Sequence, residues 1–289
     1  VAQRAISVDQ LRELRLFLQR LAKVGLLRNT TAFSKQNGTF GQGVGWEEVN
    51  LYQVADEVIK KVIPYVDPEG ERDPGGSIRR WYSWVELIAD RPQPGTMMFS
   101  HWWGGRFKDF MAIVDKLVVD RSMSINTTIW VCTFANCQFG EDFGPLLEDC
   151  PFIRALRTVE LTVLLVDFRG GSLFRTWCGL EMQYTTQHDQ ELILYTSAGR
   201  VGSSYVSGGP LVEMVKHWDI RLSEASEPSY RRQIFNYVAG VEELRGLKVG
   251  GDGGMLVDEM GRPQLRDEER VAAEGDEGEA ERRITGDLE

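Results

Sequence analysis

Val159-Glu160-Leu161-Thr162-Val163-Leu164-Leu165-Val166-Asp167 is an almost continuously apolar run. Such a run is typical of a strand that is covered on both faces of a sheet. Shorter runs with strand composition lie at 97–99, 127–133 and 191–195. Segments of helical periodicity separate these runs, most clearly over Arg106–Arg121. The alternation predicts an α/β fold in which a parallel sheet is flanked by helices on both faces.

The residues before the first of these strands are predicted to be mainly helical. Ser7-Val8-Asp9-Gln10 has the form of a capping box, and leucines follow it at helical spacing. A second helix is expected over 50–64, where Asn50 and Gln53 have the spacing of a helix start. Further helices are predicted over 77–89, 152–156, 172–187, 210–222 and 228–244.

Charge and composition divide the chain into three parts. The chain has 289 residues and a formal net charge of −10. The acidic excess is concentrated in a Gly-rich end without aromatic residues, for which we expect a disordered acidic tail over 250–289. Residues 96–249 form the predicted α/β domain, and residues 1–95 form a helical N-terminal extension. The absence of a basic patch argues against nucleic acid as a partner.

The sequence offers no sign of a metal centre or a membrane span. Its four cysteines and three histidines are not clustered with the spacing of zinc ligands. The longest apolar runs, such as Leu161–Val166, have the length of strands, so no membrane partner is expected. No secretory signal is visible, and the expected location is the cytoplasm.

The segment Phe174-Arg175-Thr176-Trp177-Cys178-Gly179-Leu180-Glu181 contains the strongest candidate for a functional residue. Phe174, Trp177, Cys178 and Glu181 would share one face of a helix. A carboxylate that continues an apolar stripe is costly to bury unless it is paired or its pKa rises, and such carboxylates often have functions. The alternative is a glutamate at the edge of the stripe that reaches solvent or caps a loop.

Ser100-His101-Trp102-Trp103-Gly104-Gly105-Arg106 is the second candidate segment. It follows the first strand of the predicted sheet, and ligands of such sheets bind at the carboxyl ends of the strands. Its backbone N–H groups and Arg106 could bind an anion, and the tryptophans offer a flat surface for a ring. Equally, one tryptophan could belong to the core while the other packs on the N-terminal helices. Ser100 and His101 are adjacent, which disfavours a serine-hydrolase triad.

Two motifs resemble those of TIR (Toll/interleukin-1 receptor) domains. Trp177-Cys178-x-x-Glu181 is similar to the family's Trp-Cys-x-x-Glu helix motif, and Phe99-Ser100 is similar to its Phe-x-Ser box. The resemblance spans 96–246 and implies a flavodoxin-like parallel sheet. Together with Ser100–Gly104, the run Trp130–Asn136 also resembles a TIR-like group of dinoflagellates and related alveolates. The family's late Phe-Trp box has no clear counterpart here.

For catalytic members, the resemblance implies cleavage of the nicotinamide–ribose bond of NAD⁺ as a substrate, with no further cofactor. The motif glutamate, here Glu181, would be the catalytic carboxylate of such a signalling enzyme. Other members are non-catalytic interaction modules or scaffolds, and that alternative stays open. Catalysis in this family commonly requires self-association, and the resemblance implies that the loop at 138–151 would form the contact. The residues expected to contact the nucleotide are Ser100, His101, Trp102, Trp103, Arg106 and Trp177.

Overall fold

A computed structural model describes residues 1–36, 38–66, 71–72, 78–80, 82–140, 143, 146–167, 170–216, 223 and 228–238. The expected tail at 250–289 lies outside these residues, as do the ends of the last two predicted helices. The division of the chain at residues 95 and 249 therefore stays a prediction.

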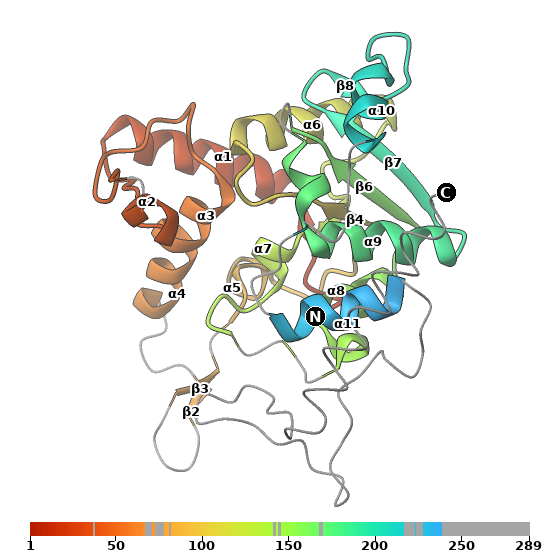
Figure 1. The fold of residues 1–289 in the computed structure, drawn as a ribbon. Coiled ribbons are helices and arrows are strands. Elements are labelled where there is room, and N and C mark those ends of the chain that lie inside the picture. The colour runs from red at the N-terminus through yellow and green to blue at the C-terminus, as the bar shows by residue number, and fades with distance from the viewer. Residues whose placement is uncertain are drawn as a thin grey trace, which may run out of the picture.

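The centre of the fold is a six-stranded mixed sheet with the order β1-β5-β4-β6-β7-β8 (Figure 1). The strands are β1 (Ile6–Ser7), β4 (Met97–Ser100), β5 (Thr128–Trp130), β6 (Leu161–Leu165), β7 (Glu191–Thr196) and β8 (Gly199–Arg200). The neighbours β5, β4, β6 and β7 are parallel, as predicted. The expectation of a purely parallel sheet is wrong, because β1 and β8 add antiparallel edges. Both edge strands have only two residues, too short for a periodic signal.

Helices cover both faces of this sheet. Alternate strand residues such as Phe99, Val163 and Ile193 belong to a core that includes side chains of α1 (Val8–Lys23) and α6 (Phe107–Asp120). The other face carries Met98 and Trp130, which pack with residues of three further helices. These are α8 (Pro151–Leu156), α9 (Thr176–Gln187) and α11 (Pro228–Val238), visible as a layer along one face of the sheet in Figure 1.

The N-terminal segments contribute to the same core. Leu11, Leu51 and Ile59 are fully buried in the cluster that contains Phe99 of β4. The two capping predictions are confirmed: Ser7 caps α1 through Gln10, and Asn50 caps α3 (Leu51–Gln53) through Gln53. The remaining elements here are α2 (Ala32–Gln36), η1 (Val54–Ile59), α4 (Lys60–Val66), β2 (Glu71–Arg72), β3 (Ile78–Arg80) and α5 (Trp84–Ile88).

Several predicted element bounds differ from the structure. The helix expected over 77–89 is limited to α5, which begins at a capping box of Ser83 with Glu86, while 78–80 form a strand. The strand expected over 127–133 ends at Trp130, because α7 (Cys132–Ala135) begins directly after it. The helix expected over 172–187 is divided into the 3-10 turn η3 (Gly171–Phe174) and α9. Two other elements complete the set, namely η2 (Leu147–Asp149) and α10 (Gly209–Lys216).

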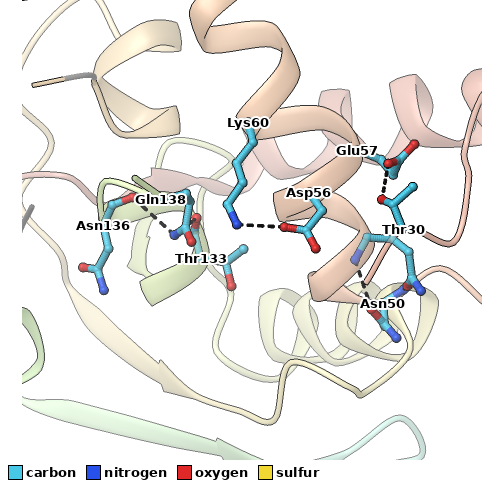
Figure 2. A network of polar contacts seen from close by, with 9 residues as sticks. Thr30, Asn50, Asp56, Glu57, Lys60, Thr133, Asn136 and Gln138 are labelled. Atoms are coloured by element: carbon cyan, nitrogen blue, oxygen red, sulfur yellow. Dashed lines mark hydrogen bonds and ion pairs between the residues drawn. The ribbon is translucent and has the colours of Figure 1, made fainter. Parts of the chain in front are cut away.

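The buried Glu57 joins the π-helical segment η1 to the loop at 28–30 by hydrogen bonds. The Glu57 carboxylate accepts hydrogen bonds from the Thr30 hydroxyl, from the Arg28 backbone N–H at 3.2 Å and from Lys61 Nζ at 2.8 Å. Figure 2 shows Thr30 and Glu57 turned toward one another. Burial would raise the pKa of Glu57, but the Lys61 and Thr30 hydrogen bonds, the charge of Lys61 and the Arg28 N–H together lower it. Glu57 is therefore a satisfied, ionised structural carboxylate.

Candidate functional site

Glu181 is buried on α9, and its side chain approaches Ser100, the last residue of β4. Its exposed fraction is 3%, so the alternative of a glutamate that reaches solvent does not hold in this structure. The Thr185 hydroxyl donates to the Glu181 carbonyl oxygen at 2.7 Å and lies 2.8 Å from the hydroxyl oxygen of Thr162 on β6. These contacts anchor this part of α9 to the sheet.

The electrostatic environment of Glu181 keeps its side chain neutral near pH 7. Burial raises the pKa of Glu181 to about 8, and the nearby Ser100 hydroxyl offsets this only in part. Ser100 ends β4 and is fully buried. Among the described residues, its Oγ has no hydrogen bond of ordinary geometry, so the Ser100–Glu181 interaction is a close approach rather than a formed bond.

The charge of this carboxyl group affects three buried thiols. Burial raises the pKa of Cys132 and of Cys150 to about 12, and a negative charge on Glu181 raises both further. Burial also raises the pKa of Cys178 well above its usual range, again reinforced by Glu181. Thiols held in this way are poor nucleophiles and poor metal ligands. Within the described part of the chain, no group of three or more His, Cys, Asp or Glu side chains could hold a metal ion.

The His101 ring lies between β4 and the residues that follow β5. Its Nδ1 lies 3.2 Å from the Phe99 carbonyl oxygen, and its Nε2 lies 3.4 Å from Thr133 Oγ1. Burial lowers the pKa of His101 to about 4, although the Phe99 carbonyl counteracts this. The imidazole is therefore neutral and is held by its neighbours.

Trp103 and Trp177 are both used in internal packing. Trp103 Nε1 donates to Cys132 Sγ at 3.2 Å, and the Trp103 ring lies 5.5 Å from that of Tyr52, centroid to centroid. Trp177 stacks on Phe152 with centroids 4.6 Å apart and also contacts Tyr230. The open question of whether one tryptophan packs on the N-terminal helices is thus answered for Trp103.

The expected apolar stripe is only partly continuous. Cys178 and Glu181 are buried on one side of α9, while Phe174 belongs to the 3-10 turn before it and is 45% exposed. The helix begins later than the spacing of three and four residues suggested, which removes Phe174 from the face.

The loop after β4 also joins the N-terminal segment. The Trp103 carbonyl accepts from Leu51 N at 3.0 Å, and Phe107 N donates to the Val49 carbonyl at 2.7 Å. Arg106 is exposed directly before α6. Trp102 is half-buried and lies between this loop and the turn that follows β6, against the backbone of Gly104 and Gly171. The structure thus brings Ser100, Trp102, Trp103 and Glu181 to one end of the sheet, while the Trp177 ring packs against Phe152 and Tyr230.

Two further hydroxyl groups are buried at this end of the sheet: that of Ser172, which lies in a stretch after a strand where the sequence already directs the search for a ligand, and that of Thr133, which sequence reasoning missed. Ser172 follows β6 and is fully buried, and its Oγ has no hydrogen-bond partner among the described residues. Thr133 follows β5 and contacts His101. Both residues lie after strands, which was the one available signal, since neither belongs to a recognisable motif.

No family model, curated protein or solved structure matches this chain. In the described residues, no helix has the length and apolar character needed to cross a membrane.

Proposed function

We propose that this chain is a TIR-like NAD⁺ glycohydrolase or related nucleotide-processing signalling enzyme, with Glu181 as its catalytic carboxylate. The observation that carries the proposal is the buried Glu181 at the carboxyl end of β4, with a pKa raised to about 8 and no cationic partner. This absence holds for the part of the chain that the structure describes. A buried, perturbed carboxyl group without a structural partner favours a functional role.

The chemistry needs an ionised carboxylate, and the substrate itself would produce one. The nicotinamide ring of NAD⁺ is positively charged, and positive charge near a buried acid lowers its pKa. Binding would therefore release the Glu181 proton. As nicotinamide leaves with the bonding electron pair, positive charge develops on the ribose, and a fixed carboxylate in a site with restricted access of water stabilises it. One water molecule then forms the new bond to the ribose carbon and loses a proton.

The order of the parallel strands supports the TIR-like part of the proposal. Taken in chain order, β4, β5, β6 and β7 occupy the sheet in the order second, first, third and fourth. This is the order of flavodoxin-like sheets, in which ligands bind where the connections diverge from the first strand. Here that point lies between β4 and β6, beside Ser100 and Ser172. Assembly through 138–151 and a cytoplasmic location belong to the same proposal.

A non-catalytic interaction module is the second candidate. The observation that favours it is the internal use of Trp103 and Trp177, because both indoles already contact other side chains of the chain. A scaffold would need Glu181 only as a buried polar residue in the end of the sheet.

The deciding experiment is NAD⁺ consumption by the purified chain at high protein concentration. We expect turnover by the wild type and a loss of at least about 100-fold in Glu181→Gln and Glu181→Ala, in the range that electrostatic groups contribute to catalysis. Glu57→Gln, which changes another buried glutamate, serves as the matched control and should keep the wild-type rate per folded protein. Equal rates in the wild type and both Glu181 variants, or no turnover by the wild type, would overturn the proposal.

A further inference from the structure

The indole of Trp102 occupies a space that two glycines leave open. A Cβ on Gly104 would lie 2.3 Å from Trp102 Cζ2, and a Cβ on Gly171 would lie 2.3 Å from Trp102 Cε3. Both distances are far below the ordinary carbon–carbon contact of about 3.5–4.0 Å. Neither glycine has a positive φ, so close approach of the indole is what requires a glycine at these two positions. The ring therefore bridges the loop after β4 and the turn after β6.

The groups at this end of the sheet lack partners that a ligand could supply. Ser100 and Ser172 are fully buried with no hydrogen-bond partner among the described residues, and Glu181 is buried as a neutral acid. Ser172 is the residue after Gly171, and Ser100 precedes Trp102 by two positions. Buried polar groups are ordinarily hydrogen-bonded, so the two buried serine hydroxyls without partners favour a ligand at this end of the sheet.

The Trp102 ring is held by packing alone, whereas Trp103 also makes hydrogen bonds. Trp103 is fixed by its bond to Cys132, by Tyr52 and by the backbone bond from Leu51. No hydrogen bond joins the Trp102 indole to any residue in the described part of the chain, and its ring is half-buried. Of the two tryptophans, Trp102 can therefore leave its position by a change of its own side-chain rotamer.

We propose that Trp102 is a gate: packed between Gly104 and Gly171, its indole covers the end of the sheet at which Ser100, Ser172 and Glu181 lie, and it must swing out before a ligand reaches them. The identity of that ligand, a nicotinamide nucleotide, rests on the proposed function, whereas the gate itself rests on the packing. Closure excludes solvent from the acid until a ligand with hydroxyl groups displaces the indole and satisfies the two serines.

The glycines allow the gate to be opened without altering the tryptophan. Gly171→Ala and Gly104→Ala place a methyl group where the ring now lies and should force it outward. Gly45→Ala is the matched control, because no atom lies within 4 Å of its added Cβ and its φ is not positive.

The readout is alkylation of Cys178 by a small neutral thiol reagent, quantified by mass spectrometry, since the Ser100 hydroxyl lies beside this thiol. Cys150, buried at the start of α8, is the internal reference.

We expect Cys178 to react at least tenfold faster in Gly171→Ala and Gly104→Ala than in the wild type and Gly45→Ala, with Cys150 unchanged. Trp102→Ala removes the gate outright and should give the same result, which keeps the test valid if one glycine variant fails to fold. No acceleration at Cys178 in the folded variants, or an equal acceleration at Cys150, would overturn the gate.

NAD⁺ consumption measured on the same variants separates the two proposals. Faster Cys178 alkylation with no turnover in any protein, wild type included, supports the gate and refutes the glycohydrolase. Turnover by the wild type with Cys178 protected in every gate variant refutes the gate and leaves the glycohydrolase standing. If both hold, opening the gate should lower the KM for NAD⁺, because closure competes with binding.

Discussion

The neutral state of Glu181 has a consequence for stability that can be measured without any substrate. Its pKa is about 8 in the native protein against an ordinary value of 4.5, so the native state holds an extra proton between these values. The contribution of this proton to the free energy of unfolding is fully present below pH 4.5. The free energy of unfolding then falls by about 1.4 kcal/mol per pH unit as the pH rises toward 8. Glu181→Gln cannot ionise, and its Tm should increasingly exceed that of the wild type across this window. Thermal unfolding between pH 4 and about 9 checks this; a constant difference in Tm would contradict a raised pKa.

Glu57 supplies a control with the opposite sign. Its native pKa is lowered, so its contribution to stability is present above the unfolded pKa and is lost as the pH falls through the native value. Glu57→Gln should therefore have a lower Tm than the wild type at pH 7, with a deficit that shrinks in acid. Comparison of Glu181→Gln with Glu57→Gln therefore distinguishes a pH dependence of Tm that comes from burial of a carboxyl group from one that comes from its ion pair.

The burial of Glu181 could be anticipated because the sequence around it carries the information. Cys178 and Leu180 flank it on the same helix, and a strand-length apolar run precedes that helix. The packing of Trp102 could not be anticipated, because it depends on Gly171, which is distant in sequence and carries no motif. The same holds for Trp103, whose partners Tyr52 and Cys132 come from different elements.

Among the elements, α1 depends on its N-terminal cap. Ser7 accepts a hydrogen bond from Gln10 N at 3.1 Å, and Ser7 N donates to Gln10 Oε1 at 2.9 Å. Ser7→Ala leaves a helix N–H without its partner and should cost about 1 kcal/mol. Ser7→Thr keeps the hydroxyl and should stay within a few tenths of a kcal/mol of the wild type. Urea unfolding midpoints test the pair, and equal losses in both variants would show that the cap is unimportant.

The elements that were predicted correctly share a local signal. Ser7 and Asn50 mark helix starts through side chains three residues apart, and the apolar runs mark the buried strands. The π-helical turns of η1 follow Gln53 without any change of pattern, because the segment still presents apolar residues to the core. The end of β5 at Trp130 was missed since Val131 and Cys132 are as apolar as the strand before them.

The whole molecule is held together by a core that crosses the expected boundary at residue 95. Ile6 of β1 pairs with Ile129 of β5, and Leu11 of α1 packs in the same cluster as Phe99 of β4. A chain that begins at residue 96 would expose this apolar face and lose one edge of the sheet. Because apolar burial is the main favourable term in folding, we expect such a fragment to show no cooperative thermal transition.

Circular dichroism and calorimetry of residues 96–289, compared with the full chain, provide the measurement. We expect a single transition in the full chain, and a broad or absent one in the fragment together with binding of a hydrophobic dye. The matched comparison is a chain that ends at residue 249, which keeps every described element and should unfold like the full chain. Cooperative unfolding of the 96–289 fragment would instead show that residues 1–95 are an independent extension. Their contacts with Trp103 would then serve the site rather than the stability of the sheet.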